Sequence, residues 1–199
     1  MIVVKDLNNS EPYKIFKKFF ESATSKNQNN IEVICISSWD NNTNEVESRF
    51  VNLKYIINED WIFFSNYSSK KAQNFKDHSQ ISALIYWNKL NVQIRMKAEI
   101  FKSSESFSDS HFCNRANEKN ALAISSKQSQ KIESYSKVVE NYEKVLSRKS
   151  KNIQRPAYWG GYSFKPYYFE FWEGNDNRLN KRKVYSKNGK QWHKYFLQP

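Results

Sequence analysis

Cysteine, glycine and proline are scarce in this sequence, and long apolar runs are missing from it. Its 199 residues include 2 cysteines, 4 glycines and 4 prolines. Cys35 and Cys113 are too few for a disulfide framework, and neither they nor the 3 histidines show metal-ligand spacing, so a reducing compartment fits best. No apolar run approaches the roughly 20 residues of a membrane-spanning helix, and the amino terminus lacks the apolar region of a signal peptide. We therefore expect a soluble, cytoplasmic protein with no membrane partner.

The shortage of glycine and proline also leaves little linker material between domains. Hydrophobic residues make up 39% of the chain and include 6 tryptophans, 12 tyrosines and 14 phenylalanines, which is enough for one sizeable core. We therefore predict a single domain over residues 1–199, with residues 1–30 forming an N-terminal helical segment that packs on it.

Positive charge exceeds negative charge in this chain. The formal net charge is +12, from 32 lysines and arginines against 20 acidic residues. Such an excess favours an anionic partner, which can be nucleic acid, an acidic membrane surface or a phosphorylated small molecule. Because the lysines are spread over the chain without a basic block, a solvated surface is the default interpretation and nucleic-acid binding is not favoured.

The pattern of apolar residues predicts a mostly antiparallel sheet with helices between its strands. Ser10-Glu11-Pro12 is typical of a helix start with Ser10 as its cap, and Asn188-Gly189 is typical of a type I′ hairpin turn. Further helices are expected at 69–75, 104–114 and 129–146. Strands are expected at 31–37, 49–57, 61–65, 81–87, 92–101, 167–172, 184–186 and 192–197. The predicted fold class is mainly β with helices (α+β), and such a sheet can close into a small barrel.

Two segments near the carboxyl end carry a pattern that packing alone does not require. The segment Arg155-Pro156-Ala157-Tyr158-Trp159-Gly160-Gly161-Tyr162 places two glycines between aromatic residues, so that a backbone can approach another group closely. The segment 170–182 holds Arg178 and Arg182, which suit an anion or an electron-rich ring. These segments resemble R-P-x-x-W-G-G-Y and E-F-W-x-G-x-x-x-R-L-H-D-R of the pyridoxine/pyridoxamine 5′-phosphate oxidase family. The resemblance extends from about Ser37 to Pro199.

The resemblance implies a fold, a cofactor and a reaction. The family fold is the FMN-binding split β-barrel, mostly antiparallel, and the active form is a homodimer with its two flavin sites at the subunit interface. The family's enzymes oxidise pyridoxamine or pyridoxine 5′-phosphate with O₂, giving pyridoxal 5′-phosphate and H₂O₂. Because the flavin carries the chemistry, the protein has to bind and position its ligands, and no catalytic triad or metal cluster is required.

A flavin site needs cations and hydroxyls for the phosphate, an apolar surface for the ring and donors at the ring edge. By resemblance, the cofactor contacts are Arg49, Phe50, Val51, Asn52, Phe64, Ser65, Lys70, Lys71, Gln93, Gln128, Ser129, Trp172 and Arg182. From the residues alone, other interpretations stay open. Arg49 fits a surface charge and Gln93 a strand residue that faces water. Ser129 fits a helix cap and Trp172 a buried structural residue.

On the substrate side the sequence departs from the family. The resemblance implies contacts to a substrate phosphate from Lys54, His111, Arg115 and Lys119, where His111 and Lys119 replace a tyrosine and a serine. Arg178 would bind the substrate and lie nearest the reacting carbon. Asn180 is assigned with Arg178 as catalytic. It replaces the family's histidine, and Lys181 replaces the family's aspartate. Two rival hypotheses remain: a split-barrel flavin oxidase with another substrate, as in secondary-metabolite biosynthesis, and a non-enzymatic flavin- or nucleic-acid-binding protein.

Overall fold

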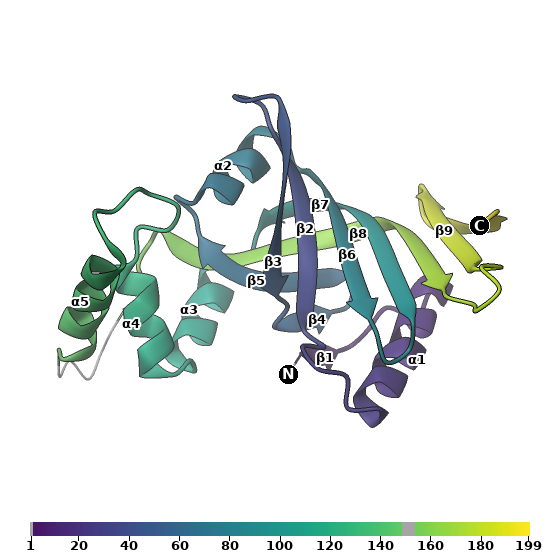
Figure 1. Ribbon diagram of the computed structural model, residues 1–199, viewed down its shortest axis with the longest axis horizontal. Coiled ribbons are helices and arrows are strands. Elements are labelled where there is room, and N and C mark those ends of the chain that lie inside the picture. The colour runs from purple at the N-terminus through teal and green to yellow at the C-terminus, as the bar shows by residue number, and fades with distance from the viewer. Residues whose placement is uncertain (1, 149–153) are drawn as a thin grey trace.

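The computed structural model describes residues 2–148 and 154–199, and one extended β-sheet organises them (Figure 1). The strands are β1 (Val3–Lys5), β2 (Val33–Asp40), β3 (Glu45–Asn52), β4 (Tyr55–Ile57), β5 (Asp60–Asn66), β6 (Gln80–Trp87), β7 (Val92–Lys102), β8 (Trp159–Glu173), β9 (Lys181–Asn188) and β10 (Gln191–Leu197). The helices are α1 (Glu11–Ser25), α2 (Lys70–Asp77), α3 (Glu105–Cys113), α4 (Asn117–Ser125) and α5 (Tyr135–Leu146). The predicted mainly β class with intervening helices is confirmed.

Strand β8 is central because it is long enough to pair with three other strands. The sheet order is β1-β4-β5-β8-β7-β6-β2-β3, with β9 paired to β8 and β10 to β9. The first part of β8 pairs with β5 and its last part with β9, while β7 pairs along the opposite edge. The pairings are antiparallel, apart from the parallel pair of β1 and β4. The order branches at β8, and in the described residues no pairing joins β1 to β3, so the sheet remains open.

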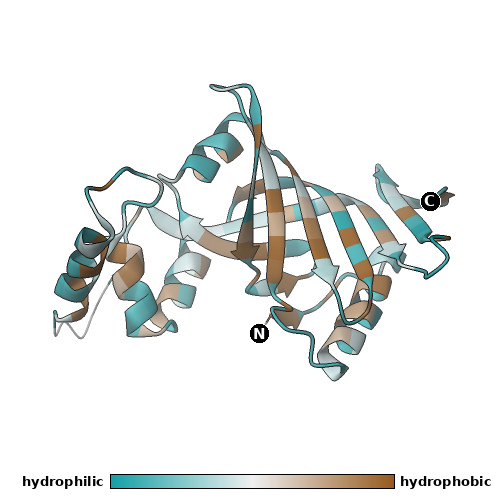
Figure 2. Cartoon of the chain, in the orientation of Figure 1, coloured by the Kyte–Doolittle hydropathy of each residue, from teal (hydrophilic) through white to brown (hydrophobic). Residues whose placement is uncertain are grey.

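Helix α1 covers one face of the sheet with aromatic side chains, as its amphipathic pattern predicts. Phe16 lies against Trp61 with ring centroids 4.5 Å apart, and Phe19 lies against Phe171 at 5.9 Å. Hydrophobic residues form bands across the central strands (Figure 2), and their burial is the main stabilising contribution to the fold. One detail was predicted wrongly: Ser10 is the N-cap residue, but its side chain makes no capping hydrogen bond.

The helix predicted over 129–146 begins only at Tyr135. Ser134 caps it, with an Oγ that accepts a hydrogen bond from Lys137 N–H. Ser129 has a left-handed φ of 73°, which an α-helix does not contain. The apolar spacing that suggested the longer helix therefore extends beyond the residues that form it. Helix α4 and strand β1 were not predicted, because short elements carry too little periodicity to be recognised.

Strand boundaries differ most from the prediction in two places, and β2 and β9 differ from theirs by two or three residues at each end. The segment 49–57 is split into β3 and β4, because its partner changes: Leu53 N–H donates to Glu32 O, next to β2, whereas Lys54 N–H donates to Ile62 O of β5. Strand β8 begins well before residue 167, since Gly160 and Gly161 pair with β5. A Cβ atom at Gly160 would overlap the hydroxyl of Tyr67, so the first of the paired glycines is required by close packing between segments.

The hairpin between β9 and β10 has a different turn from the one predicted. Asn188 pairs with Gln191, so the two central residues are Gly189 and Lys190 rather than Asn188 and Gly189. Of the two, Gly189 has a positive φ of 58°. A type I′ turn needs a positive φ at both central positions, whereas a type II′ turn needs it at the first. The turn therefore follows the type II′ pattern.

Candidate functional site

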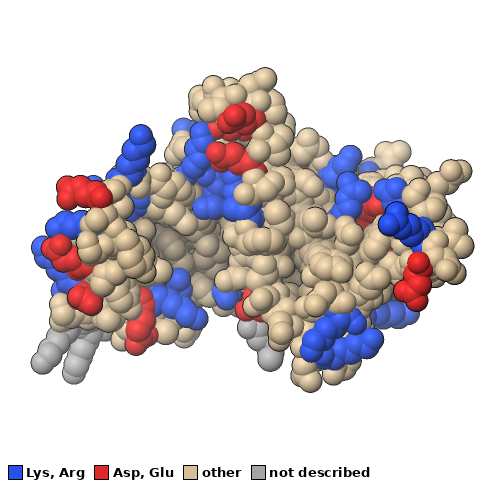
Figure 3. Space-filling view, in the orientation of Figure 1, with Lys and Arg blue, Asp and Glu red and all other residues tan. Residues whose placement is uncertain are grey.

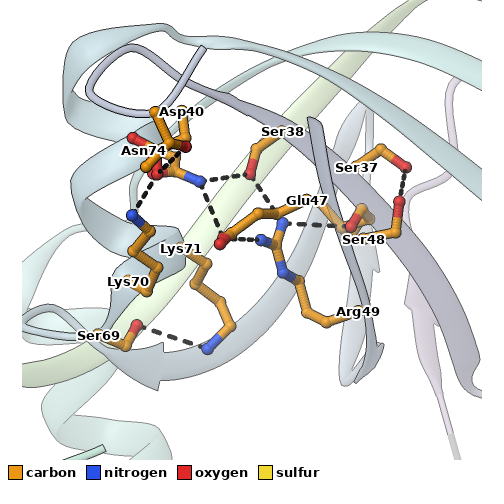
Figure 4. A network of polar contacts seen from close by, with 12 residues as sticks. Ser37, Ser38, Asp40, Glu47, Ser48, Arg49, Ser69, Lys70, Lys71 and Asn74 are labelled. Carbon is orange, nitrogen blue, oxygen red and sulfur yellow. Dashed lines mark hydrogen bonds and ion pairs between the residues drawn. The ribbon is translucent and has the colours of Figure 1, made fainter. Parts of the chain in front are cut away.

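Side chains from β3, α2 and the loop before α5 surround a cavity of about 500 Å³, which we call the cationic cradle. Its lining residues are Glu47, Ser48, Arg49, Lys70, Lys71 and Ser129. Figure 4 shows how Arg49 is held: Nη1 donates to Ser38 Oγ at 2.7 Å and Nη2 to Glu47 Oε2 at 3.0 Å. Asn74 of α2 donates to the same two acceptors at 3.2 and 3.3 Å. Arg49 is therefore oriented by the protein itself.

The two lysines of the cradle have different partners. Lys70 forms an ion pair with Asp40, a carboxylate that is 1% exposed, and this contact lowers the pKa of Asp40. Lys71 is buried, and its Nζ donates to Ser69 Oγ at 3.4 Å. Burial and then the charge of Arg49 lower the pKa of Lys71. A desolvated ammonium group of this kind gains more from an incoming anion than a paired one. Figure 3 shows basic and acidic side chains side by side in this region.

A second cavity, of about 220 Å³, adjoins the cradle and shares Lys71 with it. We call it the central pocket. Its lining residues are Phe50, Val51, Asn52, Lys54, Phe64, Ser65, Lys71, His111, Arg115 and Gln128. Each of these was named from the sequence as a cofactor or substrate contact. The structure thus brings together predicted residues from strands β3 and β5, helices α2 and α3 and three loops.

His111 and Phe64 form one wall of the central pocket. Their rings are stacked with centroids 3.7 Å apart, and His111 Nδ1 lies 2.9 Å from Tyr55 Oη. Burial, and then the charges of Arg115 and Lys54, lower the pKa of His111 to about 4. His111 is therefore neutral near pH 7, and it offers the pocket a hydrogen bond rather than a positive charge.

Arg115 and Lys54 supply the positive charge of the pocket together with Lys71. The Arg115 guanidinium lies over the Trp159 ring at 4.7 Å, and its Nη1 donates to Lys119 O at 2.8 Å. Lys119 itself does not line the pocket. Its exposed side chain borders a separate apolar depression between α4 and α5. Lys119 therefore contributes through its carbonyl group, which orients Arg115.

The loop after α4 reaches both cavities. Gln128 Oε1 accepts hydrogen bonds from Ser65 Oγ and from Asn66 N–H, both at 3.3 Å, and Gln128 lines the central pocket. Ser129 follows in its left-handed conformation and lines the cradle. The reversal of the backbone at Ser129 therefore lets two consecutive side chains serve adjacent cavities.

Three further predicted contacts lie in one line across the sheet, which we call the cross-strand row. In the register of β7, β8 and β9, Gln93 pairs with Trp172, and Trp172 pairs with Arg182. Directly paired residues of neighbouring strands present their side chains on the same face. Three half-buried residues that are far apart in sequence therefore form one continuous surface.

Arg178 and Asn180 belong to the turn between β8 and β9. Asn180 Oδ1 accepts a hydrogen bond from Asn175 N–H at 3.1 Å, and Arg178 N–H donates to Asn175 O at 2.9 Å. Arg178 has a left-handed φ of 60° and an exposed side chain. The side chain of Asn180 thus closes the turn that presents Arg178, a role that the sequence did not predict.

The cross-strand row and the central pocket lie toward opposite ends of β8. Phe64 of the pocket pairs with Gly161, whereas Trp172 of the row is near the other end of the strand. At about 3.3 Å per residue, the span from 161 to 172 is roughly 36 Å. Figure 1 shows β8 crossing the molecule from the α3–α5 end to β9. Within the described part of one chain, the predicted residues therefore fall into two groups.

Besides Ser38, Ser48 and Asn74 at the cradle, Glu47 and Tyr55 were missed in the sequence. Glu47 lies two residues before Arg49 on β3, so both side chains are on one face, and this spacing could have indicated their ion pair. Tyr55, the partner of His111, carries no comparable local signal. In residues 2–148 and 154–199, no group of metal-ligating side chains occurs, and no helix is long and apolar enough to cross a membrane.

Comparison with known proteins gives consistent matches. Residues 159–199 match the family model described as the pyridoxine 5′-phosphate oxidase C-terminal dimerisation region. The chain is 32% identical over 193 residues to a pyridoxine/pyridoxamine 5′-phosphate oxidase of Colwellia psychrerythraea, covering 96% of this chain and 88% of that protein.

Two solved structures are similar over nearly the whole chain. PhzG from Burkholderia lata, in complex with tetrahydrophenazine-1-carboxylic acid, has a TM-score of 0.90 at 23% identity, covering 96% of this chain and 93% of that one. A pyridoxamine 5′-phosphate oxidase-related, FMN-binding protein from Nostoc punctiforme has a TM-score of 0.75 at 11% identity, covering 96% and 99%. These likenesses confirm the predicted split-barrel fold.

Proposed function

We propose that this chain, which belongs to the pyridoxine/pyridoxamine 5′-phosphate oxidase family, is an FMN-dependent oxidase of pyridoxamine or pyridoxine 5′-phosphate. The products would be pyridoxal 5′-phosphate and H₂O₂, with O₂ as the electron acceptor. One observation carries this proposal: two cationic cavities adjoin each other and share Lys71. This arrangement suits one phosphate from a cofactor and a second from a substrate.

The cradle has the donors that an FMN phosphate requires. Arg49 and Lys71 would supply charge-assisted hydrogen bonds, Ser129 a hydroxyl, and the first turn of α2 the positive end of its dipole. Lys70 would act at longer range because its ammonium group is paired with Asp40. When bound, FMN would supply the hydride-accepting centre, a chemistry that amino-acid side chains lack.

The second group of predicted contacts supports a homodimer. The cross-strand row lies at residues 93, 172 and 182, and two of these positions fall in the region that the family model describes as a dimerisation region. A single flavin cannot reach both the pocket and a row roughly 36 Å along the same strand. We therefore propose that the row of one protomer completes the central pocket of its partner, so that a two-fold axis creates two equivalent sites.

The central pocket would bind the substrate phosphate. Lys54 and Arg115 would provide charge, and His111 would contribute a neutral donor whose orientation Tyr55 fixes. If Tyr55 donates to Nδ1, the proton of neutral His111 is on Nε2. Arg178 would approach the reacting carbon from the exposed turn after β8. The contribution of the protein to the reaction is thus to bind and orient both ligands.

A second candidate function is an oxidase of the same fold with another substrate. The observation that favours it is Asn180, which stands where the family has histidine and whose oxygen is engaged within its own turn. A carboxylate could bind to Lys54 and Arg115 in place of a phosphate. PhzG of Burkholderia lata, which shares the fold, was solved with a carboxylic acid.

Purified protein distinguishes these functions. We expect flavin absorbance in the protein, and H₂O₂ release with both phosphorylated vitamers but far less with pyridoxine, which lacks the phosphate. Protein that neither contains FMN nor takes it up would overturn the flavin proposal. FMN-loaded protein that is inert toward both phosphorylated vitamers would instead favour the second candidate.

A further inference from the structure

Glu170 is a buried carboxylate on β8, close to the cross-strand row, and is 1% exposed. Its Oε1 accepts a hydrogen bond from Arg182 Nε at 2.8 Å and lies 2.8 Å from Arg182 Nη2 in the ion pair of the two residues. Its Oε2 accepts from Arg95 Nη1 at 2.7 Å and from Tyr168 Oη at 3.1 Å. A carboxylate can be removed from water only where donors replace its hydration. Here strands β7, β8 and β9 each supply one of the donor residues.

The sheet register places Glu170 beside the flavin contacts that we propose. Arg95 pairs with Glu170, two residues from the pair of Gln93 and Trp172, so both pairs are on one face. Arg182 pairs with Trp172 and reaches diagonally to Glu170, a distance that a long side chain covers. Glu170 therefore sets the direction of Arg182, the charged member of the row.

The Glu170 cluster retains positive charge for a ligand. Two guanidinium groups share one carboxylate, so one positive charge is left over. Arg182 Nη1 also donates to Gln198 O at 3.0 Å, and the Arg182 side chain is 26% exposed. A guanidinium carries five N–H groups. In the described residues, Nε and Nη1 of Arg182 each donate one hydrogen bond and Nη2 faces Glu170 in the ion pair, which leaves one N–H each on Nη1 and Nη2 for a ligand.

We propose that Glu170 is a positioning residue for flavin binding, which holds Arg182 so that its two remaining N–H groups meet the cofactor of the partner's pocket. This inference rests on the proposed function. A carboxylate that only joined β7, β8 and β9 would stabilise the fold without affecting the flavin. Positioning through Arg182 makes a different prediction, because the effect of Glu170 on the flavin then depends on Arg182.

A double-mutant cycle on FMN affinity tests the proposal. The purified homodimer is freed of flavin and titrated with FMN while flavin fluorescence is followed, using Glu170→Gln, Arg182→Gln and the double variant. Glu170→Gln should weaken FMN binding about tenfold, the effect of one charge-assisted contact. In the Arg182→Gln background, the same substitution should change the affinity by less than about twofold. The matched control is Glu173→Gln on the same strand, because Glu173 is paired with Lys181 at 3.0 Å rather than with Arg182. The FMN affinity of this variant should equal that of the wild type.

Two results would overturn the proposal: unchanged FMN affinity in a folded Glu170→Gln variant, or an equal loss of affinity in both backgrounds, which indicates a structural role alone. If circular dichroism shows that Glu170→Gln does not fold, Glu170→Asp enters the same cycle, because it keeps the charge and shortens the reach. Wild-type protein that binds no FMN overturns the proposed function and this inference together, so the two kinds of failure are distinguishable.

Discussion

The two ends of β8 present their functional side chains in different ways. Around the cradle and the central pocket, they come from the edge strand β3, from β5, and from helices and loops, and Arg49 is held by other side chains. In the cross-strand row, the positions are set by the register of three paired strands. Residues on loops and helix ends can change without disturbing a sheet, whereas strand register is fixed by its neighbours. Of the four departures from the family motifs, His111, Lys119 and Asn180 lie on a helix or a turn, and Lys181 is the first residue of β9.

Mixed dimers should give the largest effect, because we propose that each site takes its two ends from different protomers. Lys71→Ala and Arg182→Gln should each bind FMN weakly as pure dimers. In dimers formed at random from an equal mixture, about one quarter of the sites combine two intact halves and should bind FMN tightly. Flavin titration of the mixture measures this fraction. A mixture that shows no recovery would mean that both ends act within one protomer.

Removal of Lys71 should have the next largest effect. The buried ammonium lines both cavities, and Lys71→Ala should weaken FMN binding by about 1.5–3 kcal/mol, roughly ten- to a hundredfold. Lys76→Ala is the control, since Lys76 is exposed on the last turn of the same helix. Equilibrium titration with FMN gives both dissociation constants. Equal affinities for the two variants would remove Lys71 from the phosphate site.

Sequence motifs named the residues that line the central pocket, but they did not show that the predicted contacts fall into two groups along β8. Resemblance to family motifs named each residue of the central pocket, because these motifs are local in the chain. The separation of Trp172 from Phe64 was not predictable, since it depends on β8 pairing with β5 and β9 at different positions. The neutral state of His111 was missed for the same reason: its pKa depends on burial and on charges from distant segments. Tertiary register and desolvation are not encoded in local patterns.

Asn180 offers a smaller effect at the turn after β8. Its Oδ1 closes the turn, and histidine Nδ1 is attached to Cγ in the same way as this oxygen, so Asn180→His can keep the contact with Asn175. Because the ring extends further and can hold a proton, this variant should raise kcat/KM for pyridoxine 5′-phosphate by about tenfold, or ~1.4 kcal/mol. Asn180→Ala loses the contact and should lower kcat/KM several-fold. Steady-state H₂O₂ assays measure both, and equal values for the two variants would exclude this role of the turn.

His111 should give the smallest effect, a pH response confined to the pocket end. Its pKa in the folded protein is about 4, below the ordinary 6.5, so between these values the unfolded chain binds a proton that the folded chain does not. The contribution of neutral His111 to the free energy of unfolding is therefore fully present above pH 6.5 and decreases as the pH falls toward 4. His111→Phe preserves a ring against Phe64 but cannot take up a proton, so its Tm should fall less than that of the wild type between pH 7 and pH 5. We expect a difference of roughly 2 °C, since the ring is half-exposed and screened by solvent.

His193→Gln, at an exposed position on β10, should behave as the wild type in thermal melts of the flavin-free protein. Identical pH responses of wild type and His111→Phe would show that His111 is not held neutral, and the pocket would then carry a further positive charge near pH 6.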